Sequence, residues 1–123
     1  MRFTYRLTTV ILGLVAFAAG VAAQESAYRP GDGVTYPRIV KEVKPVYTDA
    51  ARKKRIQGTV TMDVVVRSDG TVGDVNVTKS LDTEFGLDDE AVRAVKQWVF
   101  DPGTKDGKAV AVLVQIEMSF SLK

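Results

Sequence analysis

The C-terminal end of the chain carries a long two-residue alternation, which limits the fold more than any other feature. Apolar side chains occupy every second position from Val110 to Leu122, and mostly small or polar residues stand between them. This alternation predicts a β-strand with one buried face. Burial of these side chains contributes roughly 1.5–2 kcal/mol each, so the strand is expected to be central to stability.

A β-hairpin is predicted earlier in the chain. Val60, Met62, Val64 and Val66 alternate with mostly polar residues, and Ser68-Asp69-Gly70 follows as the turn. A glycine there supplies the positive φ that such turns require. The return strand runs from Val72 to Val77, and its alternation changes parity at Gly73-Asp74. We therefore expect a β-bulge at that point.

Two helices are predicted around the hairpin. Thr48 is a suitable N-cap for a short helix that continues to Ile56 and stops before Gly58. Asp88 is the expected N-cap of the second helix. Its apolar stripe recurs at helical spacing and consists of Ala91, Val95, Trp98 and Val99.

These elements predict a small two-layer α+β domain. Its three-stranded antiparallel sheet has the order second-first-last, and both helices pack on one face. The last strand, Val110–Leu122, then lies at an edge. It contains no Pro, Gly or Lys and one charge, Glu117, so it lacks the usual protection against pairing with another strand. An added peptide strand is the expected partner; the alternatives are that the leader or a second copy covers this edge.

The first residues are predicted to be a targeting segment. Arg2 and Arg6 precede an apolar run from Leu7 to Ala19, and small residues end at Ala23. We expect a signal peptide over residues 1–23, an extended leader over 24–44 that is flexible as far as Val34, and one domain over 45–123. An uncleaved membrane anchor is the alternative, because Leu7 to Ala23 is near the lower limit of about 17 residues for a spanning helix.

Composition excludes several classes of function. Two of the 17 basic residues lie in the targeting segment, so its removal leaves 15 basic and 15 acidic residues and no support for nucleic-acid binding. The chain has no His and no Cys, so the usual zinc ligands and nucleophile pairs are absent. We predict no catalytic residue, metal or cofactor. The rival hypothesis is a carboxylate enzyme that gathers Asp82, Glu84 and Asp88 in a cleft.

Seven short motifs occur in order along the chain between Pro45 and Leu122. They are P-V-Y-T-x-x-A from Pro45, I-Q-G-T-V, S-D-G-T-V, S-L-D, W-V-F-D-P, D-G-K and F-S-L. In this order they resemble the C-terminal domain of the TonB family of energy transducers. The resemblance implies that the last strand receives a short extended segment, the TonB box, from the plug of an outer-membrane transporter.

The resemblance also implies where that partner binds. Pro45 and Tyr47 match a proline–tyrosine motif close to the contact, although Thr48 stands where the family normally has proline and Lys44 where a glutamine is frequent. The predicted partner-binding residues are Pro45, Tyr47, Val112, Leu113, Val114, Gln115, Ile116 and Glu117.

Two departures from the family pattern shape the functional hypothesis. The chain has four prolines and no proline-rich spacer, and it has no histidine of the kind that couples the family's anchor to a proton-driven motor. We therefore expect a free-standing periplasmic domain that binds a TonB-box-like peptide of an outer-membrane receptor and supports TonB-dependent transport. An inner-membrane-anchored energy transducer and a structural homodimer through the same edge are the alternatives.

Overall fold

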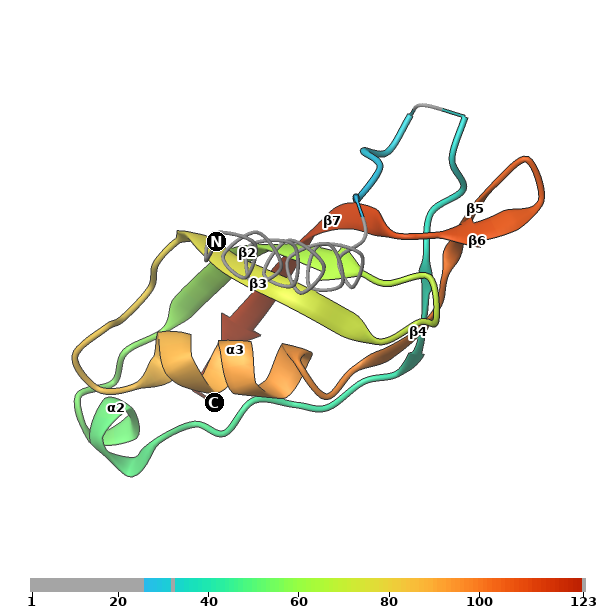
Figure 1. Ribbon diagram of the computed structural model, residues 1–123. Helices are drawn as coiled ribbons and strands as arrows, with labels where there is room; N and C mark the ends of the chain where they lie inside the picture. The colour runs from blue at the N-terminus through green and yellow to red at the C-terminus, as the bar shows by residue number, and fades with distance from the viewer. Residues whose placement is uncertain (1–25, 32, 123) are drawn as a thin grey trace, which may run out of the picture.

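The computed structural model describes residues 26–31 and 33–122, which form a sheet covered on one face by helices (Figure 1). The predicted signal peptide, residues 1–23, lies outside the described residues. The elements are β1 (Arg38–Lys41), α2 (Asp49–Lys53), β2 (Gly58–Val66), β3 (Val72–Lys79), α3 (Leu87–Val95), β4 (Val99–Asp101), β5 (Gly103–Lys105), β6 (Lys108–Val110) and β7 (Val112–Phe120).

The main sheet has the predicted topology. Its strand order is β3-β2-β7, and both pairs of neighbours are antiparallel. The β2–β7 ladder runs without a register shift from Gly58 opposite Phe120 to Val66 opposite Val112. The predicted α+β fold and the edge position of the last strand are therefore confirmed.

The hairpin that joins β2 to β3 also forms as expected. Its register slips between Val64 and Val66, which face Val75 and Val72, so the extra residue falls at the predicted bulge. Gly70 has a φ of 87°, and a Cβ there would lie 2.1 Å from the carbonyl oxygen of Phe100. Only glycine fits this turn, because it combines a positive φ with close packing against another backbone.

One hydrophobic core lies between the sheet and the helices. The side chains on one face of β2 are fully buried in it, as are Leu87, Ala91 and Val95 of α3; on β2 they are Val60, Met62, Val64 and Val66. Trp98 and Phe100 follow the helix, and their ring centroids lie 6.1 Å apart. Thr48 caps α2 as predicted, accepting a hydrogen bond from the amide of Ala51 at 3.2 Å, and the helix ends at Lys53 rather than near Ile56.

The last strand differs from the expectation at its start. Residues 110–122 do not form one strand, because the chain leaves the main sheet at Ala111. Val110 belongs to β6 and pairs with Gly103 of β5 in a separate two-stranded ribbon. A second ribbon joins β1 to β4, so the predicted extended segment pairs with the residues after α3. Val99 therefore lies in β4, 37% exposed, and not in the apolar stripe of the helix.

The start of α3 also differs from the expectation. Gly86, with a φ of 93°, is the N-cap, and Asp88 is the second residue of the helix. Asp88 is buried and accepts hydrogen bonds from the amides of Leu81 and Asp82, each at 3.0 Å. Asp82 in turn accepts from three backbone amides. The two carboxylates therefore hold the β3–α3 loop in place.

The Asp82 carboxylate is expected to stabilise the fold above acidic pH. Burial acts to raise the pKa of Asp82, but hydrogen bonds from the amides of Phe85, Leu87 and Glu84 outweigh it and lower the pKa from its ordinary 3.8. A lowered folded-state pKa gives stability that is present above 3.8 and is lost as the pH falls through the folded-state value.

Asp82→Ala should lower the free energy of unfolding at neutral pH by about 1–3 kcal/mol, because it leaves three loop amides without a partner, and one of them, that of Leu87, is buried. Denaturant unfolding at several pH values measures this loss. Glu84→Ala, which removes an exposed carboxylate from the same loop, is the control and should change little. Equal stability of the two variants would contradict the assigned role of Asp82.

Candidate functional site

The direction of the backbone groups along β7 follows from one contact outside the main sheet. The amide of Leu113 donates to the carbonyl of Tyr28 at 2.8 Å, and the amide of Tyr28 donates to the carbonyl of Ala111 at 2.8 Å. These groups of Ala111 and Leu113 therefore point away from β2. Because backbone groups alternate sides along a strand, the even-numbered residues of β7 bond to β2 and the odd-numbered residues face outward.

The outward-facing part of β7 beyond Leu113 is an open edge. In the described part of the chain, no hydrogen bond reaches the amides or carbonyls of Gln115, Glu117 and Ser119 on that side. All three residues are exposed. The edge thus presents a row of backbone donors and acceptors at the spacing that an added strand requires.

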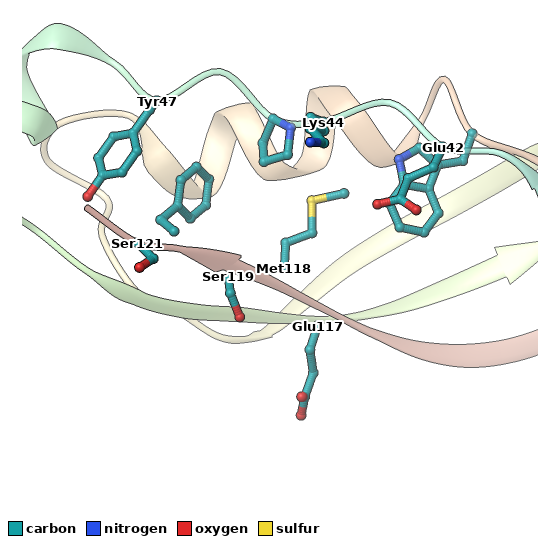
Figure 2. Close-up of a pocket in the computed structure, with 10 residues that line it drawn as sticks. Glu42, Lys44, Tyr47, Glu117, Met118, Ser119 and Ser121 are labelled. Carbon is teal, nitrogen blue, oxygen red and sulfur yellow. The ribbon is translucent and has the colours of Figure 1, made fainter. Parts of the chain in front are cut away.

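A groove accompanies the C-terminal half of this edge. It has a volume of about 400 Å³ and lies between β7 and residues 42–47, which we call the strap. Figure 2 shows the strap passing over the end of β7, with Met118 pointing toward it and Glu117 pointing the opposite way. The lining residues are Glu42, Lys44, Pro45, Tyr47, Trp98, Glu117, Met118, Ser119, Phe120 and Ser121.

The side chains of Trp98 and Tyr47 hold the strap over β7. The indole Nε1 of Trp98 donates to the carbonyl of Val43 at 2.8 Å. The hydroxyl of Tyr47 donates to the carbonyl of Ile56, and its ring meets Phe120 edge-on at 5.5 Å between centroids. Arg52 lies over the same ring, 5.4 Å from its centroid. The groove is therefore bounded by a segment fixed at both ends.

The groove combines an apolar floor with a charged rim. Met118 and Phe120 are buried in the floor, while Glu42, Lys44 and Glu117 are exposed. A site of this kind can take an extended peptide, because the edge binds its backbone and the floor takes an apolar side chain. The rim carries both signs of charge, so it does not select for an anionic or a cationic ligand.

The structure brings together only part of the predicted partner-binding set. Pro45, Tyr47 and Glu117 line the groove. Leu113 and Gln115 have outward-facing backbone groups, whereas the backbone groups of Val112, Val114 and Ile116 face β2. The side chains of Val112 and Ile116 are buried. Binding by any of these residues stays a prediction.

Sequence reasoning missed several groove residues. Glu42 and the indole of Trp98 reach the groove only through the path of the strap, which sequence periodicity does not reveal. Ser119 and Ser121 share the odd parity of Glu117, so the alternation of the last strand could have identified them. Lys44 is a departure from the family motif, and the motif does not predict its place in the groove.

The carboxylate residues of the rival enzyme hypothesis do not form a reactive cluster. Asp82 and Asp88 turn inward to backbone amides, as described above. Among residues 26–31 and 33–122, no three His, Cys, Asp or Glu side chains lie close enough to hold a metal ion. In the same part of the chain, no helix is long and apolar enough to span a membrane.

Comparison with known proteins agrees with this architecture. The family profile described as Gram-negative bacterial TonB protein C-terminal matches residues 43–122. Protein TonB of Vibrio cholerae is 36% identical over 91 residues, which cover 73% of this chain and 37% of that protein. Protein tonB2 of Pseudomonas aeruginosa is 36% identical over 78 residues, covering 63% of this chain and 28% of that protein.

A solved structure shows the same fold. The solution NMR structure of the Pseudomonas aeruginosa TonB CTD superposes with a TM-score of 0.60 at 26% identity, covering 78% of this chain and 94% of that one. This chain spans about a third of the length of the two curated relatives, 37% and 28%. The resemblance indicated by the sequence motifs is confirmed for the domain that the two proteins share with it.

The contacts of Tyr47 predict a structural role in addition to any contact with a partner. Tyr47→Phe keeps the ring packed on Phe120 but removes the hydroxyl that donates to the carbonyl of Ile56. The free energy of unfolding should therefore fall by about 0.5–1.5 kcal/mol. Thermal or denaturant unfolding measures the change. Tyr36→Phe is the matched control, because Tyr36 is 68% exposed. An unaltered Tyr47→Phe protein would contradict this role.

Proposed function

This chain belongs to the family of Gram-negative bacterial TonB protein C-terminal domains, and from that premise we propose that it binds an extended peptide of an outer-membrane transporter. The peptide adds as a strand to β7 and so supports TonB-dependent transport. The family is non-enzymatic, and the domain acts by binding.

One observation carries this proposal. On one side of β7, the outward-facing backbone groups of Gln115, Glu117 and Ser119 bond to none of the described residues, and on its other side the strand pairs with β2 without interruption. An added strand can satisfy these groups at every second residue. Main-chain hydrogen bonds of this kind provide affinity with little dependence on the peptide's sequence.

The groove supplies the sequence-dependent part of the binding. Its floor at Met118 and Phe120 can take an apolar side chain of the peptide, and the strap closes over that side chain at Pro45 and Tyr47. The exposed Glu42 and Lys44 can then pair with charges that flank the apolar residue. Pairing at a solvated rim contributes little to affinity and more to the choice of partner.

We also propose a periplasmic location. The predicted export segment at residues 1–23 and the family to which the domain belongs both support it. Binding at the β7 edge uses the same residues whether that segment is removed or stays as an inner-membrane anchor. An anchored form would be the energy-transducing alternative.

The proposal predicts that Gln115→Pro weakens partner binding while the fold survives. Gln115→Pro removes an outward-facing amide, and proline is tolerated on an edge strand where that amide faces solvent. Binding should weaken at least about tenfold, since ladder hydrogen bonds are lost and the ring obstructs pairing. Gln115→Ala is the matched control, because it keeps the backbone amide.

Isothermal titration with synthetic peptides from the plug segments of the host's outer-membrane transporters measures this effect. Circular dichroism checks that each variant is folded. Undiminished binding by a folded Gln115→Pro variant would rule out strand addition at β7. Sedimentation equilibrium at several concentrations tests the homodimer alternative, which requires self-association that Gln115→Pro disrupts.

A further inference from the structure

The leader of this chain already occupies one end of the β7 edge. Tyr28 forms a parallel bridge opposite Val112, with two hydrogen bonds of 2.8 Å to the carbonyl of Ala111 and the amide of Leu113. These are the same kind of outward-facing groups that the rest of the edge leaves open. Tyr28 therefore binds β7 in the way that the first residue of an added strand would.

A turn and an anchor bring Tyr28 to this position. The amide of Thr35 donates to the carbonyl of Thr104 at 2.9 Å, and the amide of Thr104 donates to the hydroxyl of Thr35 at 2.8 Å. Between this anchor and Tyr28, Gly31 and Gly33 have φ values of 97° and 74°. Such angles favour glycine and allow the chain to turn back toward the edge. Figure 1 shows the leader beside the β5–β6 ribbon at the start of β7.

Few contacts hold the Tyr28 side chain in place. Its side chain is 37% exposed and contacts the ammonium group of Lys105, which lies 4.9 Å from the ring centroid. Ala27 and Arg29 on either side of it are exposed. A segment with two backbone hydrogen bonds and little buried apolar surface belongs to the part of a protein that opens locally at low free energy.

The position of Tyr28 sets a limit on an added strand. A peptide that pairs from Gln115 to Ser119 leaves the leader in place. A longer peptide that continues along the edge to Ala111 needs the groups that Tyr28 occupies, so it must displace the leader. The leader and a long partner therefore compete for the same carbonyl and amide.

We propose that the leader is a reversible cap that competes with the partner strand for Ala111–Leu113 and so sets how far that strand extends along β7. This inference depends on the proposed strand addition. It adds that a segment of the same chain regulates that addition. The apparent affinity for long peptides is the intrinsic affinity multiplied by the fraction of molecules in which the edge is open. The cap leaves affinity for short peptides unchanged.

Tyr28→Pro in the full chain tests the cap. Proline lacks the amide that bonds Ala111, so the cap is weakened. Arg29→Pro is the matched control, because it introduces proline at the adjacent position. In the described structure the amide of Arg29 makes no hydrogen bond, so its loss should leave the cap in place. The probes are two lengths of one transporter plug peptide, a short one that covers Gln115–Ser119 and a long one that reaches Ala111.

The long peptide should bind Tyr28→Pro roughly 5- to 30-fold more tightly than the unaltered chain or Arg29→Pro. The short peptide should bind all three proteins equally. Equal binding of the long peptide by all three would overturn the cap while leaving strand addition intact. Failure of every peptide to bind any of them would instead count against the proposed function.

Amide hydrogen exchange provides a readout that needs no peptide. The Leu113 amide should exchange more slowly than the Gln115 amide in the unaltered chain, because only the former has an acceptor in the leader. In Tyr28→Pro the two rates should approach each other, and in Arg29→Pro they should stay apart. The same rate for Leu113 in all three proteins would contradict the cap whatever the peptides do.

Discussion

The pairing of β2 with β7 is the interaction on which the rest of this domain depends. The ladder runs from Gly58–Phe120 to Val66–Val112 without a shift, so the parity of every residue on β7 is fixed by β2. A slip of one residue would turn the buried apolar side chains to solvent. The same parity turns the backbone groups of the odd-numbered residues to the open side. One register thus determines both which side chains enter the core and which backbone groups face the open edge.

The two edges of the sheet are built differently. On β3 the register with β2 shifts twice, and Asp74 and Lys79 are exposed along it. Bulges and charges of this kind protect an edge from pairing. On β7 the register is regular, and Glu117 is the single charge in the strand. The contrast leaves β7 as the less protected edge of the sheet, which is the edge to which we propose that a partner strand adds.

Much of this architecture could be predicted from sequence. The alternation in β2 and in the last strand, the turn at Gly70 and the cap at Thr48 are local signals, and each corresponds to what the structure contains. The length of the crossover through the second helix then predicts how these elements join and which strand lies at an edge. The sheet order could therefore be predicted from the sequence.

The remainder depends on contacts between residues distant in the chain. Asp88 has the sequence of an N-cap, yet burial against the β3–α3 loop gives its carboxylate a different set of amides. The alternation through Val110 continues across a bend, because β6 pairs with β5 and not with β2. The contact of Tyr28 with β7 carries no periodic signal, since a single residue makes it.

Amide hydrogen exchange of β7 with and without a bound plug peptide tests the central claim most directly. Strand addition predicts a two-residue pattern, in which Gln115, Glu117 and Ser119 become protected on binding. The amides of Val114, Ile116 and Met118 bond to β2 and should be protected in both states. Protection that rises equally at odd and even positions, or only at residues away from β7, would contradict the account.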